Sequence, residues 1–252
     1  MVRRLILLTQ LAAVPLLAQA EERLLVPVAL RTAVPGAHGS QWETRLVVLN
    51  RTGRPVLIEG LESSCQVPAC PPLVVQPHAT ATAFPVVEGT PGIFLRVFDT
   101  TFSPAVTAHL RVQDVSRQSE TWGTEIPVVR ESDALTGATD LMDIPLGPEF
   151  RSLLRIYDFA PGSNAVLVRM FRLPDEMEPA DADPLIAEWE LTLGHGGDPR
   201  FPGYAQLMLP TTVVGERVRV EIAPLAEGMR FWAFVSVTNN ATQHITVITP
   251  QQ

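Results

Sequence analysis

The chain reads Gly-Ser-Gln-Trp-Glu-Thr-Arg-Leu-Val-Val-Leu-Asn from Gly39 to Asn50. A related pattern, Gly-Pro-Glu-Phe-Arg-Ser-Leu-Leu-Arg-Ile-Tyr-Asp, runs from Gly147 to Asp158. At a constant offset of 108 residues, the two copies match at aromatic, hydroxyl, apolar and Asx positions: Trp42 with Phe150, Thr44 with Ser152, Leu46 with Leu154, Val48 with Ile156, and Asn50 with Asp158. Each copy has an aromatic start, an alternating strand and an Asx-led turn, which is typical of half a hairpin-built module. The recurrence predicts two similar domains in tandem.

The rest of the chain also favours strands. Its 23 prolines and 16 glycines leave few stretches that could hold a three-turn helix. In residues 217–222 Arg, Arg and Glu alternate with Val, Val and Ile, which is the period of a strand. Short strands separated by turn residues every 8–12 positions, roughly, are typical of a sandwich or barrel. The sequence therefore predicts an all-β protein with two tandem Ig-like antiparallel β-sandwich domains.

We expect the domains to span residues 21–125 and 126–252, with a short linker. Ile126-Pro127-Val128 echoes Val26-Pro27-Val28, so each triplet is expected to open one domain. Because the offset there is 100 residues, the second domain needs about eight additional residues before its core hairpin. The segment Ser132–Asp143 is expected to supply them.

The predicted strands follow the alternation between turns. In the first domain they are Leu24–Leu30, Glu43–Asn50, Pro55–Leu61, Ala79–Pro85, Ile93–Asp99, Thr107–Asp114 and Thr121–Val129. In the second they are Phe150–Asp158, Ala165–Leu173, Leu185–Leu193, Tyr204–Leu209, Glu216–Ile222, Arg230–Thr238 and Thr242–Ile248. Leu154 is expected to face a core, and its neighbour Arg155 the opposite side of the strand.

The first twenty residues have the pattern of a cleaved signal peptide. Arg3 and Arg4 form a positive start, an apolar run follows to Leu17, and Ala18-Gln19-Ala20 is a small-x-small cleavage site. The run is too short to cross a bilayer comfortably. We therefore expect an exported protein, periplasmic or extracellular, whose mature chain begins at Glu21 and has no integral membrane segment.

The charge balance bears on the choice of partner. The formal net charge is −8, and it becomes −10 when Arg3 and Arg4 are removed with the signal peptide. A chain this acidic repels phosphate backbones, so we do not expect a nucleic-acid partner. All nineteen basic residues are arginines, so no lysine can act as a nucleophile or Schiff-base former.

Cys65 and Cys70 are the two cysteines, and they lie in a proline-rich stretch. In an exported protein such a pair predicts a disulfide that closes one loop. A metal site is the alternative, but the spacing is not Cys-x-x-Cys and only His78 lies nearby in the sequence. We expect the disulfide, and no cofactor.

Longer motifs resemble a known family. They are Pro-Gly-x-x-Gly-Ser-x-Trp-x-Thr-x-Leu-x-x-x-Asn from Pro35 to Asn50, Trp-Gly-Thr-Glu-Ile-Pro from Trp122, Glu-Phe-Arg-Ser-Leu-Leu from Glu149, and Phe-Trp-Ala-Phe-Val-Ser-Val-Thr-Asn-Asn-Ala-Thr-Gln from Phe231. Together they resemble a family of exported, uncharacterised tandem β-sandwich proteins from GC-rich environmental bacteria. The resemblance implies an Ig-like fold and export, and it carries over no catalytic or ligand-binding residue.

Several polar or aromatic groups have both a structural and a functional interpretation. The acidic segment 175–183 suits a solvated hairpin, with a Ca²⁺ site as the alternative. His195-Gly196-Gly197-Asp198 suits a turn, with a general base and its orienting carboxylate as the alternative. The four tryptophans suit packing positions, with a sugar-stacking platform as the alternative: Trp42, Trp122, Trp189 and Trp232.

The leading functional expectation is a non-catalytic binding or structural module with an unknown protein or glycan partner. One alternative is a two-domain periplasmic chaperone, which would hold a client carboxylate in its interdomain cleft with an Arg-Lys pair. The other is a carbohydrate-active enzyme, which needs two converging carboxylates, with candidates on or near strands: Glu43, Asp99, Glu149 and Asp158.

Overall fold

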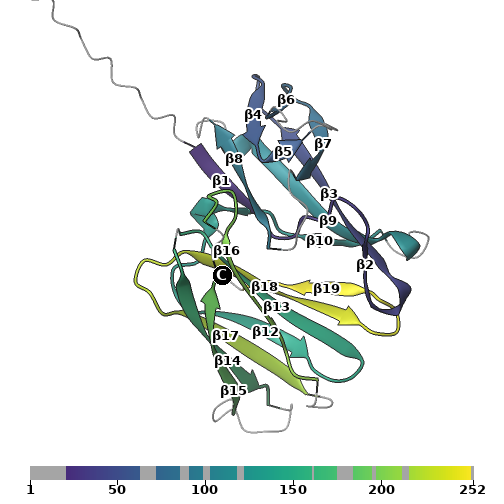
Figure 1. Ribbon diagram of the computed structural model, residues 1–252, viewed down its shortest axis with the longest axis vertical. Coiled ribbons are helices and arrows are strands. Elements are labelled where there is room, and N and C mark those ends of the chain that lie inside the picture. Colours follow the sequence, from purple (N-terminus) through teal and green to yellow (C-terminus); the bar gives the residue numbers. More distant parts are fainter. Residues whose placement is uncertain are drawn as a thin grey trace, which may run out of the picture.

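The computed structural model describes residues 21–62, 72–85, 91–98, 103–117, 122–160, 162–174, 184–194, 197–211 and 216–250. These residues form an all-β protein with four antiparallel sheets, and its helical segments are single 3₁₀ turns. The turns are Ala37–Gly39, Ser103–Ala105, Val115–Arg117 and Glu131–Asp133. The predicted all-β class is confirmed, and the strands gather in two lobes (Figure 1).

The first lobe, here the N-terminal unit, contains two sheets. One has the order β11-β1-β8-β4-β6. Its strands are β1 (Glu21–Val26), β4 (Val56–Glu59), β6 (Leu73–Val75), β8 (Ile93–Phe98) and β11 (Val129–Arg130). The other has the order β10-β9-β3-β7-β5, with β2 also paired to β3. Its strands are β2 (Val34–Pro35), β3 (Gln41–Asn50), β5 (Leu61–Glu62), β7 (Thr80–Pro85), β9 (Val106–Asp114) and β10 (Thr124–Ile126).

The second lobe, the C-terminal unit, also contains two sheets. The sheet β12-β17-β14-β15 comprises β12 (Thr139–Pro145), β14 (Asn164–Arg172), β15 (Leu185–Leu193) and β17 (Arg217–Pro224). The sheet β16-β13-β18-β19 comprises β13 (Phe150–Asp158), β16 (Gly203–Met208), β18 (Phe231–Asn239) and β19 (Ile245–Ile248). Strands β13 and β15 have the bounds that the alternation predicts.

The same strand order occurs in both units. The order β1-β8-β4-β6 corresponds to β12-β17-β14-β15, and β10-β9-β3-β7 corresponds to β19-β18-β13-β16. The registers also correspond, because Trp42 lies opposite Asp114 while Phe150 lies opposite Asn239, the last residue of β18. Trp42 and Phe150 therefore occupy matching places in their sheets.

The side chains at the matched positions make equivalent hydrogen bonds. The Asn50 side chain accepts the Thr52 amide at 2.9 Å, and that of Asp158 accepts the Ala160 amide at 2.8 Å. Both side chains are fully buried, and each forms an Asx turn that ends its strand. The hydroxyls also match, because Thr44 donates to the Leu30 carbonyl at 3.0 Å and Ser152 to the Pro145 carbonyl at 3.0 Å.

The start of the second unit differs from the expectation. Ile126 ends β10, which pairs with β9, and residues 129–130 form β11, which pairs with β1. Ile126 and Val129 are buried in the core of the N-terminal unit, so the predicted boundary at 125/126 falls inside that unit's strand pairing. The strand that corresponds to β1 is β12, and it begins inside the segment 132–143 that was expected to be an insertion.

Each unit has its own apolar core between its sheets. In the N-terminal unit Leu46 and Val48 from one sheet pack with Ile58, Leu95 and Val97 from the other. In the C-terminal unit the corresponding core contains Leu154, Ile156 and Val235 from one sheet, and Val168 and Val220 from the other. The alternation in residues 217–222 is confirmed, since all three of its apolar side chains are fully buried.

The two units share a buried junction. Tyr157, Phe159, Trp232 and Phe234 belong to the C-terminal unit, yet their side chains pack into the core of the N-terminal unit. The Phe94 and Phe159 rings lie 5.2 Å apart between centroids, and the Phe94 amide donates to the Arg200 carbonyl at 2.8 Å. Burial of this much aromatic surface holds the units together.

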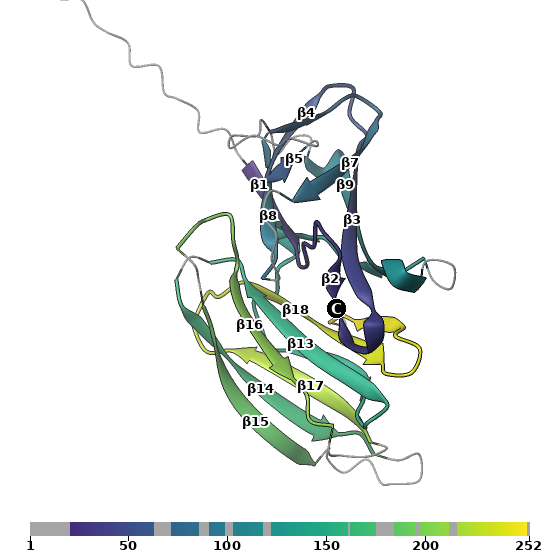
Figure 2. The same ribbon diagram turned by 45° about the vertical axis from the view of Figure 1, so that its right-hand side comes forward.

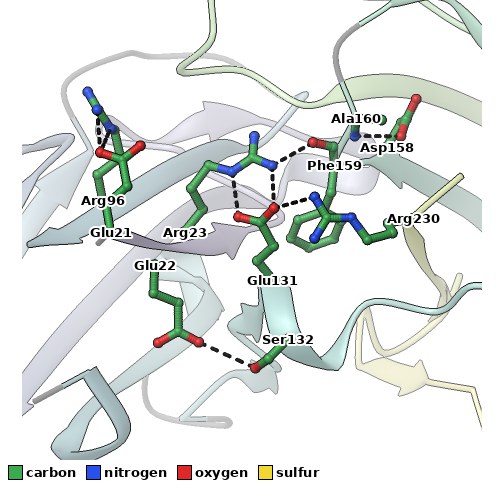
Figure 3. Close-up of polar contacts among 10 residues, drawn as sticks. All are labelled: Glu21, Glu22, Arg23, Arg96, Glu131, Ser132, Asp158, Phe159, Ala160 and Arg230. Atoms are coloured by element: carbon green, nitrogen blue, oxygen red, sulfur yellow. Dashed lines mark hydrogen bonds and ion pairs between the residues drawn. The ribbon is translucent and has the colours of Figure 1, made fainter. Parts of the chain in front are cut away.

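A polar cluster borders the aromatic junction (Figure 3). Arg23 donates two hydrogen bonds to the Glu131 carboxylate, each 2.7 Å, and a third to the Phe159 carbonyl oxygen at 2.7 Å. Arg230 donates to the same carboxylate. These arginines hold the pKa of Glu131 below its usual value, chiefly through the Arg23 hydrogen bonds. The cluster therefore joins β1, the 131–133 turn and the start of β18 through charged hydrogen bonds.

Candidate functional site

Strand β13 presents a second apolar face, on the side away from its own core. Because side chains alternate along a strand, Leu154 enters the core while Leu153, Arg155 and Tyr157 point toward the N-terminal unit. Tyr157 is fully buried at the junction. Leu153 and Arg155, which lie farther from the junction, are half-buried and face a groove between the units.

This groove, here the interunit groove, has a volume of about 330 Å³. Both views place β2 of the N-terminal unit beside the hairpin of β18 and β19 (Figure 1 and Figure 2). A hydrogen bond of 2.6 Å from the Thr124 hydroxyl to the Ile245 carbonyl oxygen joins β10 to β19 where they border the groove. The groove therefore lies between two units that are fixed to each other on more than one side.

The wall from the N-terminal unit is almost entirely apolar. Its side chains come from β2, β3, β9, β10 and the segment that follows β1: Val28, Leu30, Val34, Trp42, Val112 and Ile126. Ala37 and Thr124 complete this wall. Such a surface favours apolar ligand groups, because its burial releases ordered water.

The wall from the C-terminal unit mixes apolar groups with cations. Leu153, Met208 and Ile245 provide its apolar part. Met208 is 53% exposed, which leaves part of this wall open to solvent. Arg151, Arg155, Ser236 and Thr238 provide the polar part, so among the described lining residues the charged groups are two arginines and no carboxylate.

Both arginines have neutral partners. Arg151 donates to the Gln243 side-chain oxygen at 2.8 Å, and Arg155 to the Ser236 hydroxyl at 3.1 Å. Arg155 also lies over the Phe234 ring, 5.5 Å from its centroid. Its Nε is buried and has no hydrogen-bond acceptor among the described residues. Buried donors are nearly always satisfied in folded proteins, so the guanidinium of Arg155 is incompletely hydrogen-bonded by the described residues.

Tyr204 lies next to the Arg155 side chain. Burial raises the pKa of Tyr204, and the Arg155 guanidinium opposes that shift by its charge and hydrogen bonding. The Tyr204 hydroxyl donates to the Gln206 side-chain oxygen at 2.7 Å. At neutral pH the Tyr204 phenol next to Arg155 is therefore neutral.

The Trp42 ring is held by close backbone packing. Gly36 lies against it, and a Cβ at that position would meet the Trp42 Nε1 at 2.4 Å and the Ser40 Oγ at 2.3 Å. Glycine therefore lets the turn before β3 approach the indole. The remaining tryptophans lie elsewhere: Trp232 at the junction, Trp189 against the C-terminal core and Trp122 at the surface, 67% exposed.

The remaining candidate site residues of the sequence lie outside the described ranges or away from the groove. Cys65, Cys70, Asp99, the acidic segment 175–183 and His195 lie outside the described residues. Asp198 pairs with Arg200 at 2.6 Å in a surface turn. Glu43 accepts from Gln113, Glu149 is exposed, and Asp158 is the Asx-turn residue described above. Thus the structure brings none of the described candidate carboxylates to the groove lining.

No group of three potential metal ligands occurs among the described residues, and none of their helices could span a membrane. The arginines of the groove were not identified from the sequence as site residues. A sequence feature that could have indicated this site is the outer face of β13. Leu153 and Tyr157 on that face are large and apolar, although the opposite face of the strand already packs into the core. Large apolar residues on the outer face of a strand indicate that something covers it.

Comparison of the chain with protein-family models, with curated proteins and with solved structures gives no match.

Proposed function

We propose that this protein is an exported, non-catalytic binding module with two tandem Ig-like β-sandwich domains, and that it binds a small ligand in the interunit groove. One observation carries the proposal: an apolar groove of about 330 Å³ lies between two units joined by a buried aromatic junction. Ligand sites commonly occupy such clefts, at about 300–1,000 Å³, with few polar groups among apolar ones. The recurring strand order supports the tandem arrangement.

The rigidity of the junction supports binding without large closure. The aromatic contacts, the Glu131 cluster and the Thr124–Ile245 bond constrain the walls before a ligand arrives. A preorganised site loses less conformational entropy on binding than one that must form.

A neutral apolar dye tests the proposal. Nile red fluorescence should rise on binding, and Leu153→Trp, which puts a larger side chain into the groove lining, should weaken binding at least about tenfold. The matched control is Leu225→Trp, because Leu225 is 50% exposed and lies in the turn after β17, outside the groove lining. Equal dye binding by both variants, or no saturable binding by the wild type, would contradict the proposal.

Export is tested separately. The proposed cleavage after Ala20 predicts that the mature protein begins at Glu21. Mass spectrometry of protein recovered from the periplasm or the medium measures this directly. A full-length chain that begins at Met1 and stays in the cytoplasm would contradict export and leave the binding proposal standing.

The chaperone alternative is favoured by one observation, the two cations in the groove between the units. Both are arginines, whereas that class uses an arginine and a lysine. A chaperone would bind an extended client segment, so an apolar peptide with a free C-terminal carboxylate is compared with small ligands below.

A further inference from the structure

We propose that the interunit groove binds an amphiphilic monocarboxylate, a free carboxylate on an apolar chain, with Arg155 as the partner of the carboxylate. This inference rests on the proposed binding function and names the chemistry of the ligand.

The Arg155 guanidinium is fixed before any ligand arrives. Its Nη1 is tied to the Ser236 hydroxyl at 3.1 Å, and the group lies over the Phe234 ring. Phe234 is itself fully buried and lies parallel to the Tyr157 ring, with 6.3 Å between centroids. A planar cation held in this way presents its remaining N–H groups in a fixed direction, which suits a carboxylate.

This cation lacks a counter-ion within the described part of the chain. Three arginines on other strands, Arg23, Arg130 and Arg169, pair with carboxylates at 2.7–2.9 Å. The chain has 27 acidic and 19 basic residues, so acidic groups are not scarce. Arg155 instead has a neutral partner and a buried, unsatisfied Nε. A half-buried charge without a counter-ion is unfavourable, and an anionic ligand that reaches the open side of the guanidinium would reduce that cost.

The remainder of the groove selects an apolar chain. Leu153 lies two residues before Arg155 on the same face of β13. Trp42, Met208 and Ile245 line the groove with it. Arg151 comes next on that face, about 13 Å from Arg155 at a strand rise of about 3.3 Å per residue. Its bond to Gln243 satisfies one of its donors. The anion therefore belongs at Arg155, and the chain belongs over Leu153.

Isothermal titration with three ten-carbon probes tests the inference: decanoate, decanamide and decyltrimethylammonium. Decanoate should bind at least about tenfold tighter than decanamide, the difference expected for one charge-assisted hydrogen bond. The cation should bind most weakly. Added salt should reduce the preference for decanoate, because the interaction is partly exposed to solvent.

Arg155→Met should remove the preference for decanoate and leave decanamide binding within about twofold, since the apolar walls remain. Arg151→Met should retain most of the preference, and Arg169→Met, a change on an outer strand face, should retain all of it. If Arg155→Met does not fold, Ser236→Ala provides the second variant. It removes the anchor of the guanidinium and should reduce the preference several-fold.

The outcomes separate the two proposals. Saturable Nile red binding with equal affinity for decanoate and decanamide would overturn the carboxylate inference and leave the groove as a binding site. Absence of binding by any apolar probe would overturn both. An apolar peptide with a free C-terminal carboxylate that binds tighter than decanoate, with its amidated form inactive, would overturn the free-amphiphile assignment in favour of a client chain.

Discussion

The Tyr157 hydroxyl donates a 2.7 Å hydrogen bond to the Pro27 carbonyl oxygen, across the junction between the units. Tyr157 is fully buried, and its ring contacts those of Tyr204, Trp232 and Phe234. This one side chain therefore connects the outer face of β13 to the segment after β1, and that segment also lines the interunit groove through Val28.

Tyr157→Phe should lower the free energy of unfolding by about 1–2 kcal/mol, because the Pro27 carbonyl loses its buried donor. Urea unfolding at neutral pH measures the change. Tyr204→Phe is the comparison, since its hydroxyl is only partly buried, with the side chains of Gln206 and Arg155 as partners, and it should cost less than Tyr157→Phe. Equal costs would show that the Pro27 bond contributes nothing specific.

The same tyrosine predicts a dependence on alkaline pH. Burial raises the pKa of Tyr157 well above its ordinary value of 10.0, so the folded state keeps the proton that the unfolded chain releases. Stability is therefore complete below pH 10 and falls from about pH 10 up to the folded-state pKa. Tyr157→Phe should show a shallower fall above pH 10, with the remainder coming from groups such as Tyr204. Parallel curves for the two proteins would contradict the assignment.

Leu46 and Leu154 occupy corresponding core positions and are each at most 1% exposed. Replacing either by Ala should cost about 2–5 kcal/mol, because each change empties a packed site. Since aromatic residues of the C-terminal unit pack into the N-terminal core, both variants should lower the midpoint of one common transition. Calorimetry measures this. Two separate transitions, each moved by one variant, would show that the junction does not couple the units.

The strands that could be predicted from the sequence are those with a clear alternation of apolar and polar residues. Strand β15 was predicted because Trp189 and Leu191 face the core while Glu188 and Glu190 face water. Short strands such as β6 were missed, since three residues carry too little alternation to separate a strand from a loop. Strand β12 was missed because it includes a register shift between Leu141 and Ile144, which disturbs its period.

The candidate site was harder to predict, because it depends on packing between units. The Ile126-Pro127-Val128 triplet resembles an opening strand locally, but Ile126 and Val129 complete the N-terminal core instead. Arg155 was correctly expected on the face opposite Leu154. What covers that face is another unit, and an alternation pattern within one strand does not identify its neighbour.

Glu131 predicts a dependence on acidic pH. Its pKa lies below the ordinary 4.5, first because Arg23 bonds to it and also because Arg230 lies close. Its contribution to stability is therefore present above pH 4.5 and is lost as the pH falls through the folded-state pKa. Glu131→Gln should cost about 1–2 kcal/mol at pH 7 for a partly exposed pair, and less at low pH, where wild type and variant converge.

Acid titration of unfolding free energy checks this prediction. Glu227→Gln is the matched control, because Glu227 is exposed in the turn before β18. It should change stability by less than about 0.5 kcal/mol at either pH. A constant difference between wild type and Glu131→Gln down to low pH would contradict the role of the carboxylate charge.

The Cys65–Cys70 disulfide remains a prediction, since both residues lie outside the described ranges. Thiol titration of the oxidised, unfolded protein should detect no free thiol. The double variant Cys65→Ser/Cys70→Ser should still fold, because closing so short a loop removes only about 2 kcal/mol of chain entropy. Two reactive thiols in protein taken from the periplasm or medium would contradict the bridge.

Gly36→Ala tests whether the shape of the groove depends on the packing of Trp42. The added Cβ would lie 2.3 Å from the Ser40 Oγ and 2.4 Å from the indole Nε1, so the turn or the ring must shift, at a cost of about 1–3 kcal/mol. Gly53→Ala is the matched control, because no atom lies within 4 Å of its Cβ position. Tryptophan fluorescence should shift and Nile red binding should weaken in Gly36→Ala alone. If both variants retained wild-type fluorescence and dye affinity, the Trp42 ring would not define this wall of the groove.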